Sequence, residues 1–264
     1  MSGAEVRAEF VAGIRDNARR DRIIADEDNI VVEEAAFRSH ALWGTAGSLT
    51  PKSFSKTIHE DMEWLYNQRL VKSVKGRSIW ERILKLGGEK CPLCHIAKSR
   101  TLDHSIPKAV HPRLSVEPMN LVPACRDCNL ERNVGRGNMS LSPYFDRWAA
   151  DLRWLVATVP NPQHPEDLIF APERHGDLSD QRWESLTAFF EDTDLGSRYT
   201  NLAVDEFFPL RAALRSSFGG PPPIDDVEAV LSERHIAWRD QLGHNRWQTA
   251  AYEAWFQTAR VIPW

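Results

Sequence analysis

The feature that most constrains this chain is the placement of its cysteines. All four cysteines of the 264-residue sequence fall in two short segments, Cys91 and Cys94 in "CPLC" and Cys125 and Cys128 in "CRDC". A two-residue gap lets one turn offer two thiolates to one ion, and two such turns complete a tetrahedral four-cysteine site, the closed arrangement of structural zinc. The chain therefore has to fold so that both pairs meet, with residues 95–124 between them.

Two alternatives to zinc stay open at this point. Thiolates also suit iron–sulfur clusters, and the four thiols could be unrelated to one another. Cysteine pairs in a chain of the expected intracellular kind favour metal binding over disulfides. Zinc in a closed site would contribute to folding rather than to chemistry, because no ligand position stays open.

Composition narrows the class of protein. Hydrophobic residues make up 42% of the chain, enough to bury a sizeable core, and no run of about 18 apolar residues predicts a membrane span. The N-terminus "MSGAEVRAEF" lacks the layout of a secretion signal, so we expect a cytoplasmic protein. The net charge of −4 gives no global reason to bind nucleic acid, which leaves only a local basic patch.

The chain divides by pattern into three expected regions. Residues 1–88 are predicted to be helical, residues 89–140 lose helical periodicity, and residues 141–264 are predicted to be mostly helical, with a hairpin allowed over 154–173. The expected fold class is therefore mainly α, with a small module stapled by the cysteines.

One helix start is predicted in detail. In "SLTPKSF", Thr50 suits the N-cap and Pro51 the first helical position. We therefore expect a helix to begin here and to carry Met62, Leu65 and Leu70 on its inward face.

Polar residues inside the cysteine frame suggest hydrolytic chemistry. Asp103 and His104 are adjacent, Asn120 follows, and Asn129 comes directly after the last cysteine. Histidine suits the role of a general base near neutral pH, and hard divalent ions prefer carboxylate and amide oxygens. Each of the four taken alone is more often structural. Neighbours on a strand point to opposite faces, so the chain must bend or leave the strand at His104 for both to serve one site.

The motif C-P-x-C, then L-D-H-x-x-P-K, then N-L-V-P-A-C-x-x-C-N resembles the HNH endonucleases, which are ββα-metal nucleases, here with an added zinc on four cysteines. The resemblance covers residues 91–129 and implies a short β-hairpin followed by a helix carrying the last ligand. It implies that His104 activates water, that Asp103 and Asn129 hold catalytic Mg²⁺ or Mn²⁺, and that Asn120 orients the base.

A wider stretch through "SPYFDRW" is similar to bacterial HNH proteins, some encoded in anti-phage defence operons beside an ATPase-like partner. That resemblance implies a role in antiviral defence and a partner protein. Two positions depart from the pattern, since Asn133 stands where a basic residue is common and Ser142 where a histidine is frequent.

Local charge agrees with a nucleic-acid partner, most simply DNA. Seven basic and four acidic side chains lie between residues 98 and 136, a balance of +3 within a chain of −4. Lys108, Arg132 and Arg136 are the predicted phosphate contacts.

The competing hypothesis is a non-catalytic zinc-knuckle adaptor or nucleic-acid-binding module. It would need the four cysteines but not Asp103, His104 and Asn129 together. The flanking helical regions would dock a partner or merely shield the small module.

Overall fold

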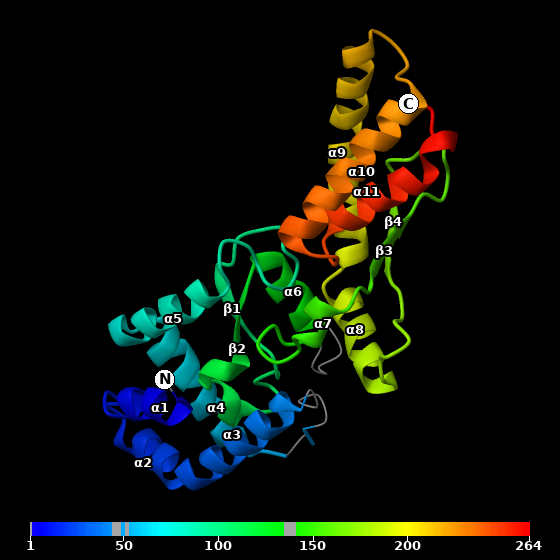
Figure 1. Cartoon of the computed structure of the whole chain (residues 1–264). Helices are drawn as coiled ribbons and strands as arrows, with labels where there is room; N and C mark the ends of the chain where they lie inside the picture. Colours follow the sequence, from blue (N-terminus) through cyan, green and yellow to red (C-terminus); the bar gives the residue numbers. More distant parts are fainter. Residues whose placement is uncertain (1, 44–48, 51–52, 135–140) are drawn as a thin grey trace. The chain divides into compact units, whose positions relative to one another are not determined.

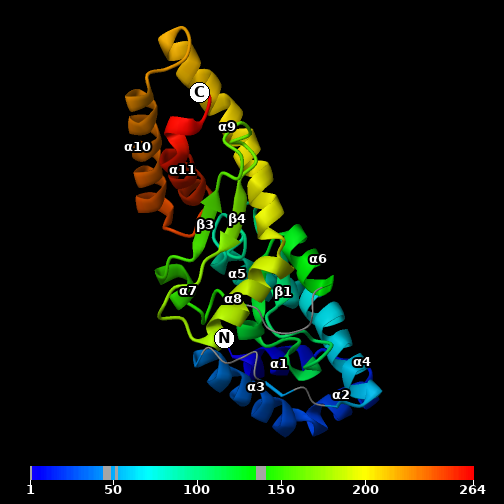
Figure 2. The same ribbon diagram turned by 90° about the vertical axis from the view of Figure 1, so that its right-hand side faces the viewer.

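The computed structural model describes residues 2–43, 49–50, 53–134 and 141–264. The chain forms two compact units, Met1–Asp146 and Arg147–Trp264. Figures 1 and 2 show their elements in two views related by a quarter turn. No helix among the described residues is both long enough and apolar enough to cross a membrane.

The first unit is helical around one small sheet. Its elements, in chain order, are α1 (Gly3–Val11), α2 (Asn17–Ala25), α3 (Glu27–Leu42), α4 (Lys56–Trp64), the π-helix η2 (Leu65–Val71), α5 (Val74–Leu86), β1 (Thr101–His104), the 3-10 turns η3 (Pro112–Leu114) and η4 (Pro118–Asn120), β2 (Leu121–Ala124) and α6 (Arg126–Val134).

The predicted cysteine-framed module forms around an antiparallel hairpin. Strands β1 and β2 pair so that Asp103 faces Val122 and His104 faces Leu121. Asp103 and His104 both lie within β1, and the chain leaves the strand only after His104. Helix α6 follows β2 after one residue and lies beside the hairpin in Figure 1.

The N-terminal helices and the hairpin share one hydrophobic core. Phe10 of α1, Leu65 of η2 and Trp80 of α5 are buried in the same cluster as Leu102 of β1 and Leu121 of β2. Burial of this kind contributes about 25 cal/mol per Å² of apolar surface, so the helices stabilise the hairpin directly.

Charged contacts bind the loop between the two strands to α3. Glu33, which is fully buried, lies 2.8 Å from His111 Nδ1. Arg113 reaches back to Asp26 at 2.7 Å. Further along the same loop, Arg38 of α3 donates to Glu117 at 2.9 Å, directly before η4. The middle and the end of the strand-to-strand loop are therefore held by α3 and its N-cap residue Asp26.

The helix predicted to start at Thr50 and Pro51 begins later. Helix α4 starts at Lys56, and the hydroxyl of Ser55 caps it by accepting from the backbone N–H of Ile58 at 3.3 Å. Serine is a strong N-cap residue, and here it lies closer to the apolar run than Thr50 does. Pro51 lies outside the described residues.

The helix is also less regular than its periodicity indicates, because it widens into the π-helix η2 after Trp64. Gly76 of α5 fits against this segment. A Cβ at this position would lie 1.8 Å from the carbonyl oxygen of Arg69 and 2.5 Å from that of Leu70. Only glycine permits so close an approach of two backbones.

The second unit is mostly helical and contains the second hairpin. Its elements are α7 (Trp148–Asp151), β3 (Leu155–Thr158), β4 (Ile169–Pro172), α8 (Asp180–Asp192), α9 (Leu195–Phe218), α10 (Ile224–Leu242), α11 (Trp247–Thr258) and the 3-10 turn η5 (Ala259–Val261). Strands β3 and β4 pair antiparallel within the span 154–173 where the sequence allowed a hairpin. The expected fold class, mainly helical with small two-stranded sheets and a buried four-cysteine cluster, is confirmed.

Candidate metal centre and hydrolytic site

The four cysteines come together as their spacing predicts. All are buried, and their sulfurs lie within 4.8 Å of one another. The sulfurs of Cys94 and Cys125, one from each pair, are 3.7 Å apart. A tetrahedral zinc ion with bonds of about 2.3 Å would separate its sulfurs by about 3.8 Å. The donor set therefore fits one zinc ion, and a disulfide would need a sulfur–sulfur distance near 2 Å.

The electrostatics of the cluster divide the four thiols into two pairs. Hydrogen bonds with the neighbouring thiols, first with Cys125, raise the pKa of Cys91 and of Cys128 far above the usual range. Hydrogen bonds from the neighbouring thiols, first from Cys125, hold the pKa of Cys94 far below its usual range. Cys128 does the same for Cys125, lowering its pKa to about 6. Backbone N–H groups also point at sulfur, from Ile96 to Cys94 at 3.4 Å and from Cys128 to Cys125 at 3.4 Å. Deprotonated sulfur is the form that binds metal, so Cys94 and Cys125, one from each of the two cysteine segments, are the thiols that lose their protons most easily, and metal binding would release the protons of Cys91 and Cys128.

His104 has a defined tautomer. Its Nε2 lies 3.0 Å from the backbone oxygen of Ser115. A carbonyl oxygen only accepts, so Nε2 carries the proton and Nδ1 keeps a lone pair. Burial, opposed by the Ser115 carbonyl and assisted by the charge of Lys108, lowers the pKa of His104 to about 4. The ring is therefore neutral at pH 7, and Nδ1 is the nitrogen that carries the lone pair.

Asp103 presents a buried carboxylate. One oxygen, Oδ1, accepts from the backbone N–H of His104 at 2.8 Å. The other, Oδ2, lies 2.8 Å from Nε of Arg132 but is hydrogen-bonded by no donor among the described residues. The contact with Arg132 is thus an ion pair without a directed N–H bond. Burial raises the pKa of Asp103, while Arg132 and the His104 N–H act against that rise.

A buried carboxylate oxygen without a hydrogen-bond donor is suited to a divalent ion, because hard cations prefer such oxygens, and the ion would take the place of Arg132. Asp103 thus fits the predicted role of a metal ligand. Asn129 is carried on α6, three residues before Arg132. Residues three apart share one helix face, so Asn129 belongs to the α6 face that Arg132 turns toward Asp103.

Asn120 is a buried clamp on the backbone. Its Oδ1 accepts from the N–H of Ile106 at 2.7 Å, and its Nδ2 donates to the carbonyls of Ile106 at 3.0 Å and Leu114 at 3.2 Å. These bonds fix the chain two residues after His104 and one residue before Ser115. Asn120 therefore fixes the loop that carries Ser115, the carbonyl partner of the His104 imidazole.

The three predicted phosphate contacts have different surroundings. Lys108 is half-buried, 3.7 Å from Glu63 and 4.8 Å from the ring centre of Tyr66. Arg132 is paired with Asp103. Arg136 lies outside the described residues.

The sequence does not predict two of the groups that contact His104. Ser115 contributes a backbone oxygen, which any residue could supply, so no sequence signal marks it. Tyr66 packs its ring 4.8 Å from the ring of His104, centroid to centroid, at an interplanar angle of 55°. It lies in the middle of an ordinary apolar pattern 38 residues before its partner, and that pattern predicts only core packing.

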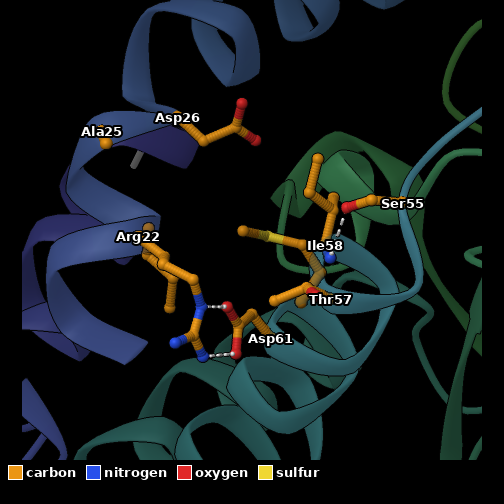
Figure 3. A pocket seen from close by; sticks show the side chains of 9 residues that line it. Arg22, Ala25, Asp26, Ser55, Thr57, Ile58 and Asp61 are labelled. Carbon is orange, nitrogen blue, oxygen red and sulfur yellow. Dashed lines mark hydrogen bonds and ion pairs between the residues drawn. The ribbon is translucent and has the colours of Figure 1, made fainter. Parts of the chain in front are cut away.

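A separate cleft of about 400 Å³ lies between α2 and α4 (Figure 3), and none of the predicted site residues lines it. Its charged groups are largely occupied. Arg22 donates to both oxygens of Asp61, at 2.7 and 2.8 Å, and Asp26 is bound by Arg113. The cleft therefore offers few unpaired charges to a ligand.

Comparison with known proteins finds partial relatives. The chain is 38% identical over 93 residues to protein ea31 of Escherichia phage lambda, a match covering 33% of this chain and 31% of that protein. It is 31% identical over 94 residues to the Septu protein PtuB of Bacillus thuringiensis, covering 30% of this chain and 34% of that protein. No protein-family model and no solved structure matches the chain. The chain is thus a distant, partial homologue that spans about a third of the length of each of these two relatives.

Proposed function

We propose that this protein is a metal-dependent HNH endonuclease that hydrolyses DNA phosphodiester bonds. The observation that carries the proposal is a neutral His104 whose ring is anchored on the Ser115 carbonyl, next in the chain to the buried carboxylate of Asp103, inside the cysteine frame. A general base and an oxygen ligand for a hard cation are the two groups that this reaction requires.

In this proposal each residue has one task. Nδ1 of His104 takes a proton from the attacking water, while Nε2–H stays on the Ser115 carbonyl and keeps the ring in place. Asp103 and Asn129 would hold Mg²⁺ or Mn²⁺, which when bound polarises the phosphate and stabilises the leaving oxygen. Asn120 fixes the loop behind the base. Zinc on the four cysteines would stabilise the frame without entering the reaction.

Cleavage of DNA tests the proposal directly. Plasmid incubated with the zinc-loaded protein and Mg²⁺ or Mn²⁺ should be cut by wild type, and His104→Ala should lose roughly 10²–10⁴-fold in rate, the usual contribution of a general base. His175→Ala, which removes an exposed histidine in the second unit, is the matched control and should cut normally. Equal cleavage by wild type and His104→Ala would remove His104 from the mechanism.

The non-catalytic alternative gives a different result in the same assay. A zinc-knuckle adaptor would bind nucleic acid without cutting it, and binding would survive alanine at Asp103, His104 and Asn129 together. Single-stranded RNA run beside DNA identifies the substrate class.

We further propose a role in anti-phage defence with an ATPase-like partner. The resemblance to HNH proteins of defence operons supports it, together with the partial match to the Septu protein PtuB. Co-purification of the tagged protein with the product of the adjacent gene, expressed from the native operon, is the expected result. A protein that cuts DNA alone at full rate would count against the partner.

A further inference from the structure

Tyr66 of the π-helix η2 brings the N-terminal helices into contact with His104 at the candidate site. Its ring lies 4.8 Å from the ring of His104, within the 4.5–7 Å range of interacting aromatic pairs. π-helical turns are rare and are found frequently at functional sites, where they displace one side chain from the regular helical face.

Tyr66 is itself held in place. It is 8% exposed, and its hydroxyl points to the carbonyl oxygen of Leu102 on β1 at 3.5 Å. Leu102 lies two residues before His104, so the tyrosine touches both the backbone and the imidazole of the same strand end. Burial, and after it the charge of Asp103, raise the pKa of Tyr66 to about 12, so the phenol stays neutral at any working pH.

A cation lies on the same aromatic ring. Nζ of Lys108 is 4.8 Å from the ring centre of Tyr66, within the range of a cation–π contact, and 3.7 Å from Glu63 on α4. The charge of Lys108 also lowers the pKa of His104. One tyrosine thus contacts both a predicted base and a predicted phosphate-binding lysine.

The Tyr66 ring is a second contact that restrains the imidazole. The bond from Nε2 to Ser115 anchors one edge of the ring, but one hydrogen bond leaves the ring free to rock about it. Packing against an aromatic ring removes that freedom, and rotamers locked by packing are what hold a catalytic group in a productive geometry.

We propose that Tyr66 is a positioning residue for His104, so that the N-terminal helical region supplies part of the hydrolytic site. This inference rests on the proposed nuclease function. A misplacement of about 1 Å can cost about 10²-fold in rate. The ring and not the hydroxyl performs this task, because the ring makes the contact with the imidazole.

The experiment compares Tyr66→Leu, Tyr66→Phe and Tyr144→Leu in the zinc-loaded full chain. Tyr144 is the matched control, because its hydroxyl also donates to a hairpin carbonyl, that of Leu121 at 2.9 Å, while its ring packs on Phe145. With Mg²⁺ and plasmid, Tyr66→Leu should lower kcat by about 10²-fold with little change in KM. Tyr66→Phe and Tyr144→Leu should stay within a few fold of wild type.

A second readout does not depend on cleavage. In the NMR spectrum, the carbon-bound ring protons of His104 should be shifted by the neighbouring aromatic ring, and its nitrogens should report a single Nε2–H tautomer. Both signatures should persist in Tyr66→Phe and Tyr144→Leu and should be lost in Tyr66→Leu. If Tyr66→Leu does not fold, Tyr66→Met replaces it, since an unbranched side chain fills the same space without a ring.

The outcomes separate the two proposals. Wild-type protein that never cuts nucleic acid contradicts the nuclease proposal, and the NMR signatures still decide the role of Tyr66. A folded Tyr66→Leu or Tyr66→Met variant that keeps kcat and the His104 tautomer overturns the positioning role. Tyr66→Phe falling as far as Tyr66→Leu also overturns it, because the hydroxyl would then be the essential group.

Discussion

Asp103 and His104 are neighbours in the chain but turn to different partners. The carboxylate of Asp103 faces α6 through Arg132, and the imidazole of His104 faces η2 through Tyr66. Alternation along a strand explains the divergence, and the end of β1 at His104 places it at the hairpin's edge. The two residues therefore connect α6 and the N-terminal helices to one point of the sheet.

Arg132 neutralises Asp103 in the absence of a divalent ion. Both side chains are less than 10% exposed, so Arg132→Gln leaves a buried carboxylate without its counter-charge. The expected cost is roughly 3 kcal/mol in the free energy of unfolding. Added Mn²⁺ should restore more stability to the variant than to wild type, because a cation at Asp103 no longer displaces an arginine. Urea unfolding of the zinc-loaded protein, with and without Mn²⁺, measures the stability loss and its recovery.

Arg126→Gln provides the control for that experiment. Arg126 begins the same helix but is exposed. Its loss should change stability by no more than about 0.5 kcal/mol, as expected for a surface substitution. Equal stabilities for Arg132→Gln and Arg126→Gln would show that the ion pair does not form in solution.

For single residues, the sequence predicts a role where the chemistry depends on local spacing. The cysteine pairs are such a case, because two residues between thiols define a knuckle wherever it occurs. The partners of His104 are not, since Ser115 acts through its backbone and Tyr66 meets His104 only through tertiary packing. The tasks of Asp103, Asn120 and Asn129 in catalysis remain predictions, to which the structure adds their contacts.

Among the elements, η2 most directly links the N-terminal helices to the candidate site. The periodicity of Met62, Leu65 and Leu70 predicts an inward face, and all three are buried. A π-helix has no periodic signature of its own over a single turn, so the sequence predicts a regular helix instead. The existence of a helix is thus predictable here, and its local widening into a π-helix around Tyr66 is not.

Gly76→Ala tests whether η2 depends on α5. The added Cβ would overlap the carbonyl of Arg69, so the two segments must separate. We expect a loss of roughly 1–3 kcal/mol in unfolding free energy, the usual cost of overpacking, together with a change in the His104 ring-proton shifts. The measurement is urea unfolding followed by NMR of the folded variant.

Gly176→Ala is the matched substitution, since a Cβ there meets no atom within 4 Å. It should leave both stability and the His104 resonances close to wild type. If Gly76→Ala behaved the same way, the close backbone contact would not be a constraint on η2.

In the whole molecule, the cysteines belong entirely to the first unit. Zinc binding in comparable small modules contributes about 10–16 kcal/mol of folding free energy, which is as large as the net free energy of unfolding of most domains. Removing zinc with a chelator should therefore unfold the hairpin and α6 while the second unit keeps its helices.

Hydrogen exchange measures this effect segment by segment. Amides of β1, β2 and α6 should lose protection on chelation, and those of α9 and α11 should keep it. Cys91→Ser should reproduce the chelated state without any chelator, and metal analysis should find one zinc and no iron in the untreated protein. Retained protection of the hairpin after zinc loss would contradict a structural role for the metal.

The order of residues around the hairpin has a further consequence, concerning covalent connectivity. One cysteine pair precedes β1 and the other follows β2, and the loop between the strands contains the exposed Ala109. A single break of the backbone at that turn would leave two polypeptides, each with two thiolates on the same metal. Together with the strand pairing and the core shared by Leu102 and Leu121, the metal would then hold the loaded protein together as a two-fragment complex after the cut.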